Sequence, residues 1–222
     1  MIGGLASAKA FLILNKMEIE KVKLQIITEQ FWNLATRMAQ AETVNLELRK
    51  TRSSPAKTKL WKIKTEAVDL ETCMKIGAIM GNGSESEVQH LGNYGRSIGT
   101  ILGLWKDFHV AVNLTSELAE KIQNGALPYT LLWARERNEK LRKKLENMAK
   151  KTTIDPSDIK EIVGDFLETG ALRKTVRATK KLSNKAVQAL AKLIGTEATQ
   201  TLTLLMEAQS QVLTESLSTL HA

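Results

Sequence analysis

The chain has 222 residues, of which 43% are hydrophobic and 5% aromatic, and its formal net charge is +8. This length and composition suit one large or two small globular domains, and they exclude disorder over most of the chain. The single cysteine, Cys73, excludes an internal disulfide framework and a cysteine-based metal cluster. No run of 18 or more apolar residues occurs, and the first residues lack the order of a signal peptide, so we expect a cytoplasmic protein without a transmembrane segment.

Apolar residues recur at steps of three and four along nearly the whole chain, which is the spacing of amphipathic helices. No stretch shows the sustained alternation of a strand. The periodic runs, in chain order, cover residues 27–41, 60–74, 159–166, 176–193 and 202–217. The sequence therefore predicts an all-α bundle of seven or eight helices.

Turn residues separate these runs. The breaks fall at residues 52–55, 81–86, 124–128, 152–158 and 195–197. None of them is a boundary that requires a second domain, so we expect residues 1–222 to form one domain.

A dense run of charge, residues 135–151, carries a narrow apolar stripe of Leu141, Leu145 and Met148. The pattern indicates either a solvated surface helix or a basic patch for phosphate or anionic lipid. A second basic stretch, residues 173–185, leaves the same alternatives open.

Conventional catalytic motifs are missing from the sequence. His90, His109 and His221 have no second histidine or cysteine at ligand spacing, so zinc is unsupported. Asp107 and His109 lie two positions apart, which on a helix points them to different sides. No P-loop, G-x-S-x-G or G-x-G-x-x-G occurs either.

Residues 64–107 contain an ordered set of weak motifs: Lys64-Thr65, Gly77-Ala78, Tyr94-Gly95 and Gly99. In order and spacing they resemble the trans-isoprenyl diphosphate synthase (polyprenyl synthetase) family. The resemblance extends to residues 3–11, 41–46, 123–132 and 168–172. It implies a helical bundle like the later two-thirds of the isoprenoid synthase fold.

The resemblance also exposes what this chain lacks. The family holds magnesium through aspartates, and its second aspartate-rich motif is Q-x-x-D-D-x-x-D. The glutamine falls at Gly103, and the three aspartates fall at Lys106, Asp107 and Val110, so one acid survives. Lys106 opposes magnesium by its charge as well as by the loss of a ligand. We therefore predict no catalytic residue and no metal site, with Asp107 as a lone ligand at most.

Other acidic positions of the family are changed as well. Gly4 and Asn45 stand where it has aspartates. The family's first aspartate-rich motif would precede residues 3–11, so we expect it to be absent along with the N-terminal helices that carry it. The resemblance then implies no cofactor of the chain's own, and Mg²⁺ only through a catalytic partner.

Lys64 and Thr65 are the candidate diphosphate-binding residues, with an exposed lysine at the start of a helix as the alternative reading. The leading hypothesis is a non-catalytic prenyltransferase-like subunit that supports or regulates a catalytic trans-polyprenyl diphosphate synthase, as a heteromer or through a homodimer. One alternative is an active transferase with altered metal dependence, in which Lys106 mimics a cation. Another is a basic helical module for anionic surfaces or nucleic acid. We expect no nucleic acid, because no binding motif occurs, and leave peripheral membrane contact open.

Overall fold

The computed structural model describes residues 9, 11–51, 55–112, 116–193, 195 and 197–218. Within these residues the chain forms ten helices and no strand, which confirms the predicted all-α class. The helices are α2 (Lys21–Thr51), α3 (Ala56–Glu66), α4 (Val68–Met80), α5 (Glu85–Val112), α6 (Ser116–Gln123), α7 (Tyr129–Arg135), α8 (Glu139–Met148), α9 (Pro156–Glu168), α10 (Ala171–Leu190) and α11 (Glu197–Ser218). None of these helices combines the length and apolarity that crossing a bilayer requires.

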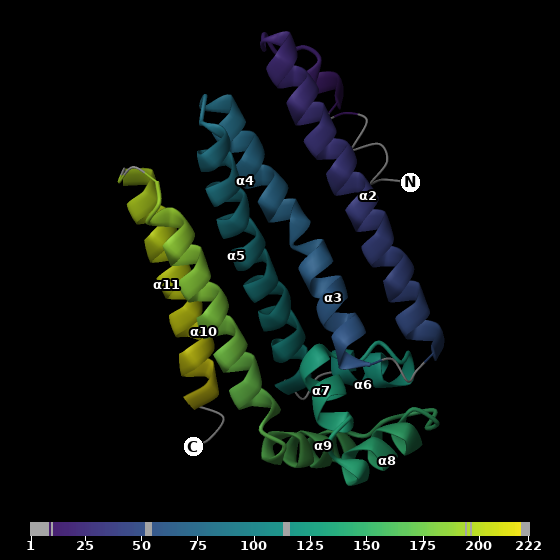
Figure 1. Cartoon of the computed structure of the whole chain (residues 1–222). Helices are drawn as coiled ribbons and strands as arrows, with labels where there is room; N and C mark the ends of the chain where they lie inside the picture. The colour runs from purple at the N-terminus through teal and green to yellow at the C-terminus, as the bar shows by residue number, and fades with distance from the viewer. Residues whose placement is uncertain are drawn as a thin grey trace.

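Helix α5 lies at the centre of the bundle (Figure 1). It packs against α3 and α4 on one side and against α10 on the other. Helices α2 and α11 form the two outer layers, α2 against α3 and α4, and α11 against α10. The short helices α6 to α9 close one end. This central position explains why α5 carries four of the twelve largest fully buried side chains, Tyr94, Ile101, Leu104 and Phe108.

The run at residues 60–74, which the periodicity predicts as one helix, is two helices that meet at Ala67. Ala67 has a ψ of −5°, which departs from regular helix geometry. It lies at a close approach to α5, because a Cβ atom at position Gly99 of α5 would be 2.9 Å from the Cβ atom of Ala67. The bend lets both α3 and α4 keep contact with α5.

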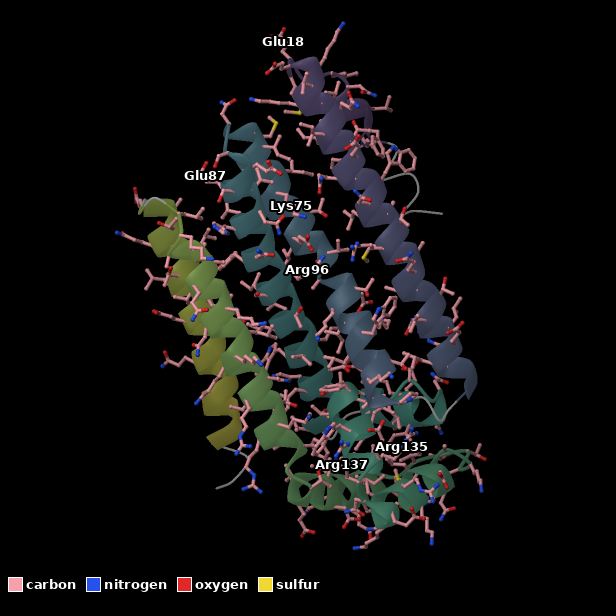
Figure 2. The ribbon with its side chains drawn as sticks, in the orientation of Figure 1. Glu18, Lys75, Glu87, Arg96, Arg135 and Arg137 are labelled. Carbon is pink, nitrogen blue, oxygen red and sulfur yellow. The ribbon has the colours of Figure 1, made fainter. Side chains whose placement is uncertain are left out.

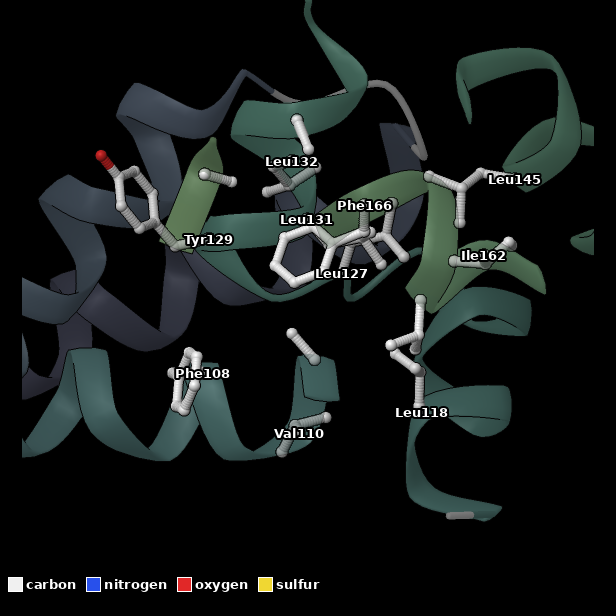
Figure 3. Packing of buried hydrophobic residues seen from close by; sticks show 14 of the residues in the cluster. Phe108, Val110, Leu118, Leu127, Tyr129, Leu131, Leu132, Leu145, Ile162 and Phe166 are labelled. Atoms are coloured by element: carbon white, nitrogen blue, oxygen red, sulfur yellow. The ribbon is translucent and has the colours of Figure 1, made fainter. Parts of the chain in front are cut away.

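The largest hydrophobic cluster fills the closed end of the bundle (Figure 3). Phe108 and Val110 reach it from the last turns of α5, and Phe166 from α9. Burying one large apolar side chain stabilises the fold by about 1.5–3 kcal/mol relative to leaving it exposed. The end of α5, where the second aspartate-rich motif aligns, is therefore part of the core.

The charged run at residues 135–151 is not one helix. Arg135 ends α7, and α8 begins at Glu139, where the side chain of Asn138 accepts a hydrogen bond from the backbone N–H of Leu141 (3.0 Å). An N-cap asparagine satisfies a free N–H group of the first turn, so a new helix starts at this point. Leu141, Leu145 and Met148 are buried, as the stripe predicted.

Ion pairs join α8 to α9. Lys144 contacts both Glu161 (2.5 Å) and Asp165, and Lys140 contacts Asp165 at 3.1 Å. The hydrogen bond from Lys144 lowers the pKa of Asp165 below its ordinary value, and Lys140 adds to the shift. A carboxyl group with a lowered pKa stabilises the folded state above its unfolded pKa of about 4, and this contribution is lost as the pH falls through the lower, folded value.

We expect Asp165→Asn to lower the free energy of unfolding by about 1 kcal/mol at pH 7, since Lys144 and Lys140 lose their shared carboxylate. The difference from the wild type should shrink below about pH 4, where the carboxyl group becomes protonated first in the unfolded state and, at lower pH, in the folded state. Urea titrations at several pH values measure both effects. Glu29→Gln, at an exposed residue outside this network, is the control and should leave the pH dependence unchanged. A difference that is constant with pH would show that the charge of Asp165 has no part in it.

Candidate functional site

An open groove of about 420 Å³ lies between α2 and α3. Its wall combines apolar groups with two lysines. The lining residues are Val44, Lys57, Thr58, Leu60, Trp61 and Lys64. Cations beside an apolar wall suit a ligand that has an anionic head and a hydrocarbon part.

The two residues of the Lys64-Thr65 pair have different surroundings. Lys64 is exposed and lines the groove. Thr65 is buried, and its hydroxyl donates a hydrogen bond to the backbone oxygen of Trp61 (2.9 Å) one turn earlier. Of the predicted diphosphate contacts, Lys64 is therefore the one that faces the groove. Lys57 and Trp61 were missed in the sequence, because a lysine or tryptophan on a helix gives no signal of the groove it faces.

Asp107, the surviving acid of the second motif, has protein partners for both carboxylate oxygens. The Lys59 ammonium lies 3.4 Å from Oδ1, and the backbone N–H of Tyr129 donates to Oδ2 at 2.6 Å. Tyr129 is the first residue of α7 and has a free N–H group that needs an acceptor. Asp107 thus links α3, α5 and α7.

The other three positions of the motif face three different environments. Lys106 is exposed to solvent. Val110 is 7% exposed and packs in the main cluster. Gly103 lies against α3, because a Cβ atom there would be 2.7 Å from Cγ2 of Ile63. The structure brings Gly103 and Val110 into helix packing rather than to a shared ligand.

Magnesium needs several oxygen ligands converging on one point. Among the described residues, no group of three His, Cys, Asp or Glu side chains is placed to hold a metal ion. Asp107 is already used by Lys59 and Tyr129, and Lys106 beside it is positive. The residues at the second motif therefore do not fit a magnesium site. The ring of His109, two residues after Asp107, packs edge-on against the ring of Trp105, with centroids 4.5 Å apart.

We expect Asp107→Ala to destabilise the fold by about 1–3 kcal/mol. The variant removes the acceptor of the backbone N–H of Tyr129 and the carboxylate beside the largely buried Lys59. Asp107→Asn keeps an acceptor for Tyr129 and should cost less. Thermal unfolding with and without Mg²⁺ measures both. A wild-type midpoint that rises with Mg²⁺, and a rise that both variants lose, would instead identify Asp107 as a metal ligand.

A charged cluster that the sequence analysis missed ties α4 to α5. Glu71 is 8% exposed and accepts hydrogen bonds from Lys75, four residues on (2.7 Å), and from Arg96 of α5. Figure 2 shows Lys75 and Arg96 on these neighbouring helices. The spacing of Glu71 and Lys75 is a recognisable helical ion pair, whereas Arg96 joins it through tertiary packing alone.

Two curated relatives from Arabidopsis thaliana match part of the sequence. Geranylgeranyl pyrophosphate synthase 3, chloroplastic, is 32% identical over 106 residues, which are 45% of this chain and 29% of the relative. Putative geranylgeranyl pyrophosphate synthase 8, chloroplastic, is 35% identical over 95 residues, 41% of this chain and 26% of the relative. The match thus spans less than a third of either relative, and no family model matches the chain.

Solved structures match over a larger share. The geranylgeranyl pyrophosphate synthetase of Pyrococcus horikoshii superposes with a TM-score of 0.80 and 21% identity, covering 91% of this chain and 63% of that one. A geranylgeranyl pyrophosphate synthase of Corynebacterium glutamicum, solved with isoprenyl diphosphate and magnesium, superposes with a TM-score of 0.78 and 18% identity, covering 96% and 61%. At these identities the likeness establishes the fold.

The helical bundle around α5 is therefore an isoprenoid synthase fold, covering less than two thirds of the length of these solved synthases. Over less than half of the chain the sequence is also similar to the two geranylgeranyl pyrophosphate synthases. Fold and partial sequence match both agree with the resemblance to trans-isoprenyl diphosphate synthases that the motifs carry.

Proposed function

We propose that this chain is a non-catalytic prenyltransferase-like subunit, which assembles with a catalytic trans-polyprenyl diphosphate synthase and supports or regulates it. The observation that carries the proposal is the state of the second aspartate-rich motif. Val110 is part of the core, and Asp107 is occupied by Lys59 and the N–H of Tyr129. With its acids replaced or engaged, this motif offers no ligand set for the magnesium that family catalysis requires, so Mg²⁺ enters only through the partner.

The surface of α2 supports an assembly role. Trp32 and Leu46 are 62% and 52% exposed, and they lie 14 residues apart, close to four helical turns. Val22 and Ile26 add further exposed apolar area to the same helix. A helix with apolar residues on its packed and unpacked sides is typical of an element that a partner covers. The expected occupant is the catalytic chain, with a second copy of this chain as the competing outcome.

The test is co-purification with a complete trans-prenyl diphosphate synthase of the same organism, followed by assays of its activity and product length. We expect a stable complex with altered activity or products, lost in the double variant Trp32→Glu, Leu46→Glu. The control is Leu204→Glu, Leu205→Glu on α11, whose leucines are 64% and 50% exposed. The proposal is wrong if the synthase behaves identically with and without this chain. Self-association alone, lost in the α2 variant, would assign that face to a homodimer.

An active transferase with altered metal dependence is the second candidate, and the groove lined by Lys57, Lys64 and Trp61 favours it. The purified chain would be incubated with allylic and homoallylic diphosphates, with and without Mg²⁺. Turnover that Lys64→Met abolishes would establish this reading, and no turnover in either condition removes it. Inorganic diphosphate binding that requires Lys64 but gives no turnover would leave the groove as a residual binding site of a non-catalytic subunit.

We propose that residues 1–222 form one domain. The contacts of α5 with both α4 and α10 support this proposal. The cytoplasm stays our prediction for its compartment. The names of the two plant relatives include a chloroplast location, so cell fractionation with cytosolic and plastid markers is the measurement that decides.

A further inference from the structure

The positive charge of this chain is concentrated in one segment. Residues 169–196 contain seven of the 32 lysines and arginines and none of the 24 acidic residues, so they account for seven of the eight net charges. Six of the seven lie on α10. The net charge of +8 therefore comes mainly from one strongly basic helix, and the rest of the chain is nearly neutral.

The six cations of α10 all face solvent. They are Arg173, Lys174, Arg177, Lys180, Lys181 and Lys185. Their spacing puts them on one side of the helix, in a stripe about 18 Å long at 1.5 Å per residue. The opposite side of α10 is buried against α5, α7, α9 and α11, with Leu172, Ala186 and Leu190 in the core. We call these six residues the α10 stripe.

The stripe differs from the other basic helix, α8, in its pairing. Lys140, Arg142, Lys143 and Lys144 of α8 each contact a glutamate or aspartate. No residue of the α10 stripe forms an ion pair with an acidic side chain in the described part of the chain. At the end of the stripe, Lys174 lies over the ring of Trp133, 5.1 Å from its centroid. The charges of α8 are internally neutralised, whereas those of α10 are available to an anionic partner.

We infer that the α10 stripe docks this protein on an anionic membrane surface through lipid phosphate and carboxylate groups. A straight row of cations on one face of a helix suits a flat charged surface. Nucleic acid fits less well, because sites for single strands interleave cations with aromatic rings, and α10 contains no aromatic residue. The apolar side of α10 is buried in the bundle and cannot insert, so the attraction is electrostatic and should require anionic lipid.

The test is co-sedimentation of the full chain with phosphatidylcholine vesicles, with and without phosphatidylserine. We expect binding to the anionic vesicles alone, and its loss as salt shortens the screening length from about 8 Å at physiological ionic strength to about 3 Å at 1 M. Neutralising four cations of the stripe should weaken binding about tenfold or more. The stripe variant is Arg177→Gln, Lys180→Gln, Lys181→Gln, Lys185→Gln.

A matched control removes the same charge elsewhere, from exposed lysines that form no ion pair with an acidic side chain among the described residues. It is Lys16→Gln, Lys21→Gln, Lys150→Gln, Lys160→Gln, and it should keep most of the vesicle binding. Equal loss in both variants would mean that net charge, not the stripe, is responsible, and would overturn the inference. So would absence of binding to anionic vesicles, or stripe-dependent binding to RNA, DNA or an acidic protein in its place. Because the chain is tested alone, the outcome is independent of whether a catalytic partner exists.

Discussion

Val110→Asp, which restores an aspartate of the family motif, is expected to lower the free energy of unfolding by at least about 3 kcal/mol. Val110 is 7% exposed and lies in the main hydrophobic cluster with Phe108 and Leu118. A carboxylate at this position would lose its water without gaining a cation. Denaturant unfolding at neutral pH measures the loss.

The loss of stability caused by Val110→Asp should depend on pH in a characteristic direction. Burial disfavours the charged form, so the new carboxyl at position 110 should have a raised pKa in the folded state. The penalty is then largest at neutral pH and falls as the pH drops toward the unfolded value of about 4. A penalty that does not change with pH would point to lost packing of Val110 rather than to a buried charge.

Lys106→Asp is the matched control, since it restores another acid of the same motif at an exposed position. We expect it to change the free energy of unfolding by no more than about 0.5 kcal/mol. Adding Mg²⁺ to either variant should leave the unfolding midpoint unchanged, because no set of converging oxygens forms. A marked rise with Mg²⁺ in a double variant that combines Lys106→Asp and Val110→Asp would show that the metal site can be rebuilt, and would count against a subunit whose packing excludes the metal.

Gly95→Ala is expected to destabilise the protein by about 1–3 kcal/mol, although alanine is the better helix former. A Cβ atom at position 95 would lie 2.5 Å from the backbone oxygen of Leu70 and 2.9 Å from Cγ of Met74. A backbone oxygen cannot move aside as a flexible side chain can, so α4 and α5 must separate. Thermal and urea unfolding of the variant measure the cost.

Gly77→Ala, on the neighbouring helix α4, is expected to change the stability in the opposite direction. A Cβ atom at position 77 meets nothing within 4 Å, and Gly77 is exposed in the last turns of α4. Replacing it removes conformational freedom from the unfolded chain and should stabilise the protein by about 0.5–1 kcal/mol. Stabilisation by Gly95→Ala as well would contradict the close approach of α4 and α5 at Gly95, and destabilisation by Gly77→Ala would contradict the open space at Gly77.

Much of the architecture follows from local periodicity. The steps of three and four around Phe166, Leu182 and Leu202 predicted helices that the structure contains, and the loss of acids at positions 106 and 110 was visible from the motif alone. The sequence failed at two joints, Ala67 and residues 136–138. A helical run continues through both, and only the contact of Ala67 with Gly99 and the cap by Asn138 interrupt it.

The roles of the individual charged residues were decided by tertiary structure. Asp107 looked like the remnant of a metal site, but its partners Lys59 and Tyr129 come from other helices, 48 and 22 positions away. The basic helices α8 and α10 resembled one another as sequences, yet α9 supplies acids to α8, and no described acidic side chain pairs with the cations of α10. Helical periodicity acts between residues three or four apart, so the sequence alone determined the helices and the lost acids. Whether a charge is neutralised depends on which distant segment packs beside it, and only the folded chain decides that.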